Sequence, residues 1–147
     1  MKVILQRVSE AEVRVHSQVV GAINSGLLIL VGIHQDDTPA ELSWMADKVA
    51  GLRIFRDAAG KMNLSVGDAQ GAILAVSQFT LFADTKKGKR PSFGAAARPE
   101  QAKALFDDFC NLLRAHDLKV ETGIFGADMQ VKLVNDGPVT IPIERNA

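Results

Sequence analysis

The first stretch whose residue types could do chemistry is Asn135-Asp136-Gly137-Pro138. It follows an apolar run from Met129 to Val134 and precedes β-type residues from Val139 to Ile143. Asn, Asp and Gly tolerate unusual backbone angles, and proline has a fixed φ and no N–H group. A Gly-Pro corner therefore holds bare main-chain carbonyls in a fixed direction, with no side chain in the way. On spacing alone, an ordinary hairpin or bend is the simpler explanation.

A second candidate is the polar end of an apolar run. Residues 72–76 read Ala-Ile-Leu-Ala-Val, which is typical of a buried strand. Ser77, Gln78 and Thr80 then interrupt the run around Phe79. If these polar groups are buried, each needs a partner, at a cost of about 1–3 kcal/mol when left unpaired. The alternative is a strand end whose polar side chains face water.

The usual catalytic sets are missing from the sequence. A serine or threonine nucleophile needs an adjacent base, which is most often histidine. The chain has three histidines, at positions 16, 34 and 116. None of them lies in a motif with Ser77 or Thr80, so a solvated or structural role is expected for each. There is no HExxH pattern, cysteine pair, His-carboxylate cluster or Gly-rich phosphate loop, so we expect neither a metal site nor a cofactor.

One basic cluster stands out in an otherwise balanced chain. Its members are Lys86, Lys87, Lys89 and Arg90, while the formal net charge of the whole chain is zero. Any contact with nucleic acid must therefore come from a local patch and not from overall charge. The cluster is either a solvated loop or a set of phosphate contacts.

Composition indicates a single domain of ordinary globular type. The 147 residues are 47% hydrophobic and 23% charged, and a chain of this length buries about two-thirds of its unfolded surface. The one cysteine, Cys110, lies among apolar residues in a helical pattern, so we expect it to be buried and inert. No signal peptide is evident, and no apolar run approaches the roughly 20 residues needed to span a bilayer. A reducing cytoplasm is the simplest location.

Periodicity predicts a strand-rich chain with two long helices. Thr38, Pro39 and Glu41 are typical of a helix start and predict a helix to about residue 51, and Pro99 opens a second one. The expected strands are 2–8, a hairpin of 12–16 and 18–21, 26–33, 53–56, 71–76, and three more in 119–144, separated by turns at 126–128 and 135–138. We therefore predict the α/β class, with mixed β-sheets and helices packed on them in one domain, residues 1–147.

In combination, the motifs resemble those of a known family. Ser-Gln-Phe-Thr-Leu at 77–81, Arg-Pro-Ser-Phe at 90–93 and Asn-Asp-Gly-Pro-Val-Thr at 135–140 accompany Leu-Gln-Arg-Val at 5–8 and Lys-Met-Asn-Leu at 61–64. Over almost its whole length the chain resembles the bacterial D-aminoacyl-tRNA deacylases. The resemblance implies a three-layer α/β/β fold and a homodimer in which the Gly-Pro corner reaches the other subunit's active site. It also implies tRNA charged with D-amino acids, or with glycine, as substrate.

The resemblance places the catalytic positions at Ser77, Gln78, Phe79 and Thr80. An aminoacyl ester is labile and carries its own neighbouring 2′-hydroxyl, so positioning and main-chain hydrogen bonds can suffice. We hypothesise that the N–H groups of Phe79 and Thr80 form an oxyanion site, while the Thr80 hydroxyl orients water or the ester. The rival hypothesis makes Thr80 a covalent nucleophile, but the missing base argues against it.

The same positional match assigns substrate selectivity to the corner. Gly137 and Pro138, joined by a cis peptide in the family, would bind the substrate's α-amino group and leave no room for an L side chain. Glycine, which has no side chain, would pass this filter. Phe125 and Met129 would line the pocket near the corner, although ordinary core positions explain them equally well. Arg7 would brace the corner through main-chain oxygens, with a surface ion pair as the alternative.

Two other functions stay open from the sequence. The first is a catalytically idle RNA-binding module that uses the four basic residues 86–90. Neutral net charge and the lack of interleaved aromatic residues count against it. The second is a structural dimer whose Gly-Pro corner only locks subunits together.

Overall fold

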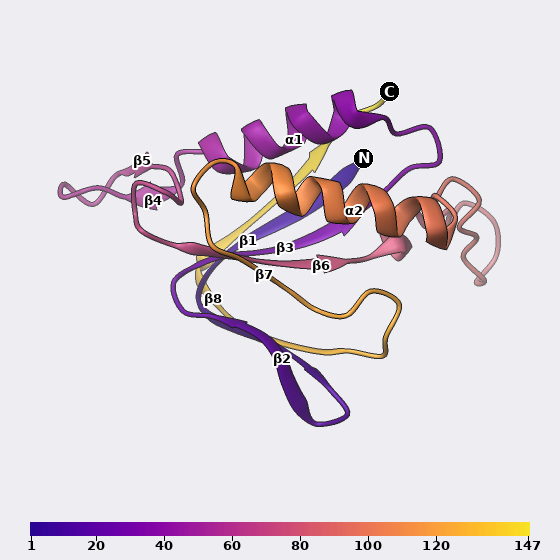
Figure 1. Cartoon of the computed structure of the whole chain (residues 1–147), viewed down its shortest axis with the longest axis horizontal. Helices are drawn as coiled ribbons and strands as arrows, with labels where there is room; N and C mark the ends of the chain where they lie inside the picture. The colour runs from indigo at the N-terminus through magenta and orange to yellow at the C-terminus, as the bar shows by residue number, and fades with distance from the viewer.

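One mixed sheet holds six of the eight strands in the computed structural model, which describes residues 1–147 (Figure 1). In chain order the elements are β1 (Lys2–Val15), β2 (Gln18–Ile23), β3 (Gly26–Gly32), α1 (Pro39–Gly51), β4 (Phe55–Arg56), β5 (Met62–Leu64), β6 (Ala72–Ser77), the 3₁₀ turn η1 (Phe79–Phe82), α2 (Pro99–Arg114), β7 (Val120–Thr122) and β8 (Gln130–Glu144). Strands β4 and β5 pair only with each other.

The sheet is organised around the long strand β1. Its first half pairs with β3 and its second half with β2, while β8 pairs along nearly its whole length. The pairs β3–β6 and β6–β7 are parallel, and the others are antiparallel. The sheet curls until β2 approaches β7, where a Cβ on Gly21 would collide with the carbonyl of Thr122. This nearly closed sheet is a consequence of one long, twisted central strand.

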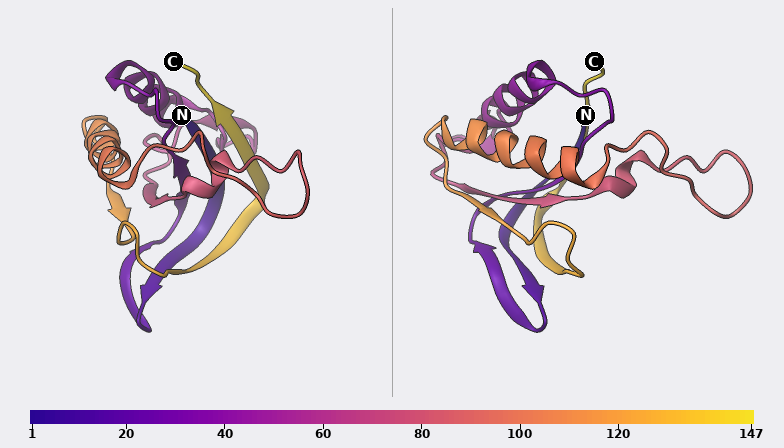
Figure 2. Two further views of the ribbon diagram at one scale, coloured as in Figure 1. Left: turned by 90° about the vertical axis from the view of Figure 1, so that its right-hand side faces the viewer. Right: turned by 45° about the vertical axis from the view of Figure 1, so that its right-hand side comes forward.

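Two hydrophobic clusters form on opposite faces of the sheet. The larger one, of 25 buried residues, lies under the two helices, which both cover the same face (Figures 1 and 2). The smaller one, of seven residues, fills the curl on the other face. Successive side chains of β3 alternate between them, with Leu27 and Ile29 in the first cluster and Leu28 in the second. This confirms the prediction that the apolar run at 26–33 is a strand buried on both faces.

The mixed α/β class, both helices and the first hairpin are confirmed. The hairpin turns at His16 and Ser17, which both adopt positive φ. None of the helices is both long and apolar enough to cross a membrane. The three-layer description and the homodimer remain predictions.

Two predicted divisions of the chain into strands were wrong, and one strand pairing was not predicted. The strands expected at 2–8 and 12–16 are one continuous strand, because β1 keeps a partner on each side along its length. The pairing of residues 62–64 with β4 was not foreseen. The C-terminal third holds two strands instead of three, since residues 135–138 form a bulge inside β8 and the chain does not reverse there.

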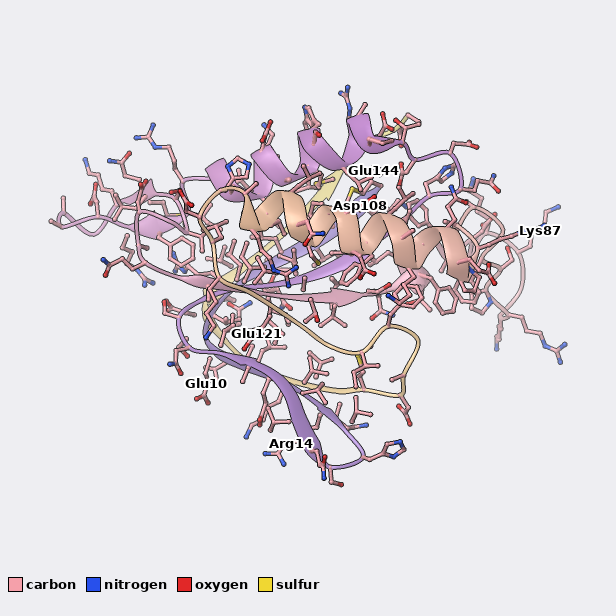
Figure 3. All side chains as sticks on the ribbon, in the orientation of Figure 1. Glu10, Arg14, Lys87, Asp108, Glu121 and Glu144 are labelled. Atoms are coloured by element: carbon pink, nitrogen blue, oxygen red, sulfur yellow. The ribbon has the colours of Figure 1, made fainter.

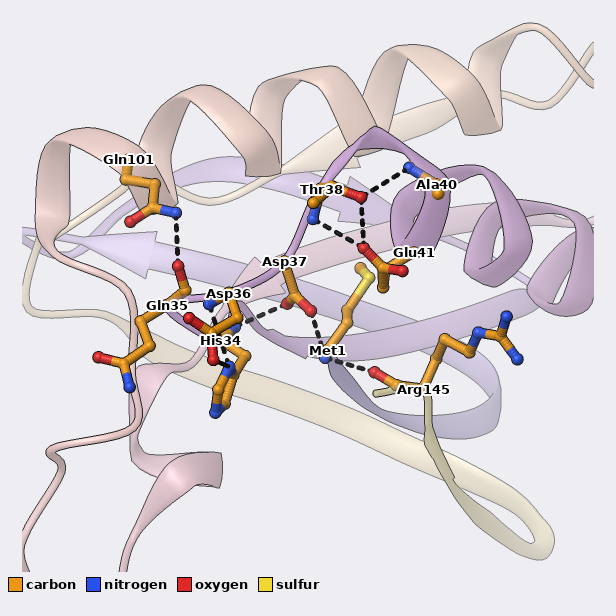
Figure 4. A network of polar contacts seen from close by, with 10 residues as sticks. All are labelled: Met1, His34, Gln35, Asp36, Asp37, Thr38, Ala40, Glu41, Gln101 and Arg145. Atoms are coloured by element: carbon orange, nitrogen blue, oxygen red, sulfur yellow. Dashed lines mark hydrogen bonds and ion pairs between the residues drawn. The ribbon is translucent and has the colours of Figure 1, made fainter. Parts of the chain in front are cut away.

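The chain ends meet in a polar network beside the start of α1 (Figure 4). The amino group of Met1 donates to Asp37 Oδ1 at 2.8 Å and to the carbonyl of Arg145 at 2.7 Å. The other oxygen of Asp37 accepts the N–H of His34 at 2.7 Å. Both members of the Met1–Asp37 pair have fully buried side chains. The network fixes the loop between β3 and α1, whose His34 packs against the turn that follows β6.

Replacement of Thr38 by alanine is expected to destabilise the fold by about 0.5–2 kcal/mol, because it removes the N-cap. The Thr38 hydroxyl accepts from the N–H of Ala40 and donates to Glu41 Oε2 at 2.6 Å. The second bond lowers the pKa of Glu41 below its ordinary 4.5. The stabilisation that comes from this bond is therefore fully present above pH 4.5 and is lost as the pH falls through the lowered pKa of the folded protein. Urea unfolding at pH 7 and below pH 4.5 measures both effects.

The matched control is Thr85→Ala, at an exposed loop position, which should change the free energy of unfolding by less than about 0.5 kcal/mol. A Thr38→Ala protein as stable as the control at pH 7 would contradict the capping argument.

Candidate active site

The turn η1 begins where the buried strand β6 ends. Ser77 is the last residue of β6 paired with β3, and Gln78 donates its N–H to the carbonyl of Val31 at 2.8 Å. The chain then winds into η1 directly over Gly32. A Cβ on Gly32 would lie 3.1 Å from Cβ of Leu81, a tight approach that would push the turn outward by a few tenths of an ångström. The strand thus delivers a short polar turn at a fixed position on the sheet edge.

Thr80 presents its hydroxyl at the surface of this turn. The hydroxyl accepts a hydrogen bond from Gln78 Nε2 at 2.6 Å, and neither Ser77 nor Thr80 bonds to a histidine. The N–H groups of Phe79 and Thr80 open a helical turn, where amides have no partner within the turn. Phe79 and Thr80 are exposed. The arrangement can offer hydrogen bonds to a substrate oxygen, but it holds no general base.

The underside of η1 is held by Phe82, which is only 8% exposed. The His34 ring meets it edge-on with a centroid separation of 5.3 Å. The ammonium of Lys2 lies 4.9 Å from the centroid of the Phe82 ring. It also donates to the carbonyl of Leu81 at 3.5 Å. Sequence reasoning missed Lys2 and Phe82, because nothing in their local pattern shows that they meet.

The histidines have structural or solvated positions, as expected. His34 Nδ1 accepts the N–H of Asp36 at 3.1 Å. His116 lies 2.9 Å from Asp47 and links the end of α2 to α1, while His16 is exposed in the hairpin turn. No group of three or more His, Cys, Asp and Glu side chains is placed to hold a metal ion.

A largely apolar cavity of about 540 Å³ opens beside the turn. Its walls come from Ser77, Gln78 and Phe79, from Phe93 to Ala97, from the start of α2, and from the loop 125–129. The rings of Phe79 and Phe93 meet edge-on, 5.1 Å apart. The structure therefore brings five predicted residues to one cavity, which are Ser77, Gln78, Phe79, Phe125 and Met129, with Thr80 on the adjoining turn.

The corner at 135–138 is a closed bulge in β8. On β1, Gln6 faces Thr140 and Val8 faces Asn135, so four residues of β8 lie opposite Arg7 alone. The amide side chain of Asn135 closes the bulge, since it accepts the N–H of Val139 at 2.8 Å and donates to its carbonyl at 3.1 Å.

The peptide bond between Gly137 and Pro138 is cis, as the resemblance implied. A Cβ on Gly137 would lie 2.5 Å from the nitrogen of Val139, so no side chain fits there. Gly137 and Pro138 are both exposed. The bulge thus presents bare backbone to its surroundings.

Arg7 holds the base of the bulge from inside the protein. Its side chain is 2% exposed, and its Nε donates to the carbonyl of Asp136 at 2.8 Å. Its Nη1 donates to the carbonyl of Ile54 at 2.6 Å. Arg7 therefore braces the corner through a main-chain oxygen, as predicted. Its Nε also lies 3.7 Å from Asp136 Oδ2, so an ion pair from a buried guanidinium to a half-exposed carboxylate accompanies the hydrogen bond.

The corner and the turn η1 of one chain lie apart. Arg7, at the corner, faces Leu27 in β3, which in turn pairs with Ile73 in β6. Along β6, Ser77 lies four residues beyond Ile73, which at about 3.3 Å per residue is a distance of about 13 Å. Across the sheet, three strand spacings separate β8, which carries the corner, from β6. Phe125 and Met129 therefore lie with η1 and not beside the corner of their own chain.

The basic loop, residues 84–92, follows η1 directly and projects from the molecule (Figures 2 and 3). Asp84 and Ser92 exchange two main-chain hydrogen bonds at its base, of 2.7 and 3.0 Å. Lys86, Lys87, Lys89 and Arg90 are all exposed. The cluster therefore lies at the same end of the molecule as the cavity and the turn.

Cys110 takes no part in the site. It is buried in α2, and burial raises the pKa of its thiol to about 12. The thiol is therefore protonated at neutral pH and unreactive, as predicted.

Comparison with known proteins assigns the chain to a family. The family model described as D-Tyr-tRNA(Tyr) deacylase matches residues 4–144. The D-aminoacyl-tRNA deacylase of Exiguobacterium sp. is 58% identical over 147 residues, which is 100% of both chains. That of Thermotoga petrophila is 58% identical over 144 residues, 98% of this chain and 97% of its own.

Two solved structures share the fold. The c-Myc DNA unwinding element binding protein superposes with a TM-score of 0.93 at 44% identity, over 100% of both chains. A probable eukaryotic D-amino acid tRNA deacylase superposes with a TM-score of 0.83 over 97% and 98% of the two chains, and at 18% identity it shows the fold alone.

The site of this protein is a polar turn without a base, beside an apolar cavity. The protein is of the deacylase class, whose members hydrolyse the ester bond of aminoacyl-tRNA. The chain belongs to the D-Tyr-tRNA(Tyr) deacylase family.

Replacement of Arg7 by methionine is expected to lower the free energy of unfolding by about 2–5 kcal/mol, because it strands the carbonyls of Asp136 and Ile54, at about 1–3 kcal/mol for each buried unpaired group. Arg14→Met, at an exposed position on the same strand, should change it by less than about 0.5 kcal/mol. Denaturant titration of both variants gives the comparison. Equal losses in the two variants would show that the two hydrogen bonds contribute little.

Proposed function

We propose that this protein hydrolyses the ester bond between a D-amino acid and the terminal ribose of a tRNA. The observation that carries the proposal is the turn η1, which presents two opening amides and the Thr80 hydroxyl beside an apolar cavity. This equipment suits a labile ester and does not suit an unactivated amide, because no base accompanies it. Family membership supports the same reaction.

In the proposed reaction, water attacks the ester carbonyl carbon. The carbonyl oxygen gains negative charge, which the N–H groups of Phe79 and Thr80 stabilise. The Thr80 hydroxyl, already held by Gln78 at 2.6 Å, orients the water or the ester. The bond to the ribose oxygen then breaks, and the proton released by water goes to that oxygen, with the neighbouring 2′-hydroxyl close by. Orientation of this kind contributes about 7–11 kcal/mol in favourable cases.

The cavity suits the terminal nucleoside of the tRNA. Phe79, Phe93 and Phe125 line it, and aromatic side chains stack on any nucleobase. The basic loop, which starts two residues after η1, then meets the phosphates next to that nucleoside. The proposal therefore has tRNA as the macromolecular partner and the cytoplasm, where charged tRNA is used, as the place of the reaction.

Selectivity for the D form requires a second chain in this proposal. The corner does not reach Thr80 of its own chain, yet it is exposed and rigid. In a homodimer, Gly137 and Pro138 of one subunit would enter the cavity of the other, beside its Phe125 and Met129. Main-chain carbonyls there would bind the α-amino group and exclude an L side chain, while glycine would still be accepted.

The proposal predicts that the pure protein releases D-tyrosine from D-Tyr-tRNA and leaves L-Tyr-tRNA intact. Gly-tRNA should also be deacylated, because glycine has no side chain to exclude. Release of labelled amino acid measures all three. A tRNA-binding module would bind all three substrates and release nothing, and a structural dimer would neither bind nor release.

Replacement of Phe79 by proline tests the oxyanion site, since it removes one N–H at a helix position that tolerates proline. We expect kcat to fall about 10²–10³-fold. The matched control, Phe79→Ala, loses the ring but keeps the N–H, so its effect should fall mainly on KM. Equal kcat for the two variants would argue against a catalytic amide at this position.

Replacement of Thr80 by alanine separates the two roles of its hydroxyl. An orienting hydroxyl predicts reduced but measurable turnover, because the main-chain amides remain. A nucleophile predicts complete loss of turnover, together with an acyl-enzyme that can be trapped in the wild-type protein and detected by mass spectrometry. The second result would overturn the orienting role.

A further inference from the structure

Two short segments of the chain are enriched in positive charge. One is the basic loop, and the other is the hairpin segment, residues 53–64, which carries Arg53, Arg56 and Lys61. Together they hold seven of the 17 lysines and arginines but only two of the 17 aspartates and glutamates. They lie at opposite ends of the long axis of the molecule (Figures 1 and 3). In a chain of zero net charge, such segregation marks both ends as basic surfaces.

The hairpin segment is tied to the corner. The same Arg7 side chain that binds the carbonyl of Asp136 also binds the carbonyl of Ile54, at the start of the segment. Arg56 Nη1 in addition lies 3.4 Å from Asp136 Oδ2. Because one buried guanidinium holds both backbones, the hairpin segment must go wherever the corner goes.

Hydrogen bonds brace the hairpin segment, which presents an exposed lysine. Asp57 Oδ1 accepts the N–H groups of Ala59 and Lys61 at 2.9 and 3.0 Å, which closes its tip. Arg53 binds the main-chain and side-chain oxygens of Asn63 and so fixes its base. Lys61 lies at an exposed position and joins these hydrogen bonds only through its main-chain N–H, which leaves its ammonium available to a partner.

We propose that the hairpin segment of one subunit contacts the phosphate backbone of a tRNA whose charged end is bound in the other subunit. This inference rests on the proposed function, in which the corner crosses between subunits. Each site would then have a basic surface on both sides, the basic loop from its own chain and the hairpin segment from its partner. Lys61 gives sequence-independent attraction, so the contact adds affinity for any tRNA. Arg56 already pairs with Asp136 and serves mainly to hold the segment to the corner.

The test compares two substrates with the full-length dimeric protein. One is D-Tyr-tRNA, and the other is the trinucleotide CCA carrying D-tyrosine, which has no stem. Lys61→Glu should lower kcat/KM on D-Tyr-tRNA about tenfold at low salt and leave kcat within twofold. It should also reduce the slope of log kcat/KM against log salt concentration by about one. On the trinucleotide, the change should be less than about twofold, because that substrate ends before the hairpin segment.

The charge-matched control is Arg14→Glu at the exposed tip of the β1–β2 hairpin, outside both basic segments (Figure 3). It should leave kcat/KM on both substrates unchanged. A Lys61→Glu protein that behaves like this control would overturn the inference, as would equal losses on both substrates. If the wild-type protein hydrolyses neither substrate, the proposed function fails, and the inference fails with it.

Mixed dimers test which subunit supplies the contact. One chain carries Phe79→Pro, so that only the other chain's site is active. Lys61→Glu on the silent chain should lower kcat/KM on D-Tyr-tRNA, whereas Lys61→Glu on the active chain should not. The reverse result would overturn the crossing of the hairpin segment, while leaving hydrolysis itself intact.

Discussion

A single buried guanidinium ties the Gly137–Pro138 corner and the segment that begins at Ile54 to the central strand. Arg7 lies in the central strand and donates to two main-chain carbonyls, at Asp136 and at Ile54. A charge removed from water is tolerated only when its donors are satisfied, and here the acceptors are backbone oxygens whose positions are fixed by the fold. The base of the corner is therefore tied to the core beneath it, although Gly137 and Pro138 themselves are at the surface.

The rest of the corner is built to keep its backbone bare. Asn135 replaces the missing ladder bonds with its own side-chain amide, which binds both polar groups of Val139. Gly137 has no room for a Cβ. In the proposed function the corner distinguishes D from L amino acids whatever their side chain, and backbone atoms suit that role because they do not depend on the identity of the side chain. The same reasoning applies to η1, where amides replace an acid-base pair.

Both functional turns depend on contacts from distant parts of the chain. Gly32 gives η1 the space to pack on the sheet, while His34 and Lys2 hold Phe82 underneath it. These residues lie 45 or more positions before the turn. Their roles come from two strand pairings. The parallel pair β3–β6 places Gly32 and His34 beside the turn, and the antiparallel pair β1–β3 sets Lys2 opposite Gly32.

The sequence by itself determined the fold class, both helices, the strand buried on both faces and the cluster of polar residues after β6. It could do so because capping residues, hydrophobic periodicity and strand-end polarity are local signals. Residues 135–138 were expected to be a turn between strands. Asn, Asp, Gly and Pro favour a bulge as readily as a chain reversal, so the local sequence could not distinguish the two. Only tertiary pairing with β1 decided between them. The partners of Arg7, the cavity and the separation of the corner from η1 were likewise set by long-range packing, which no local pattern encodes.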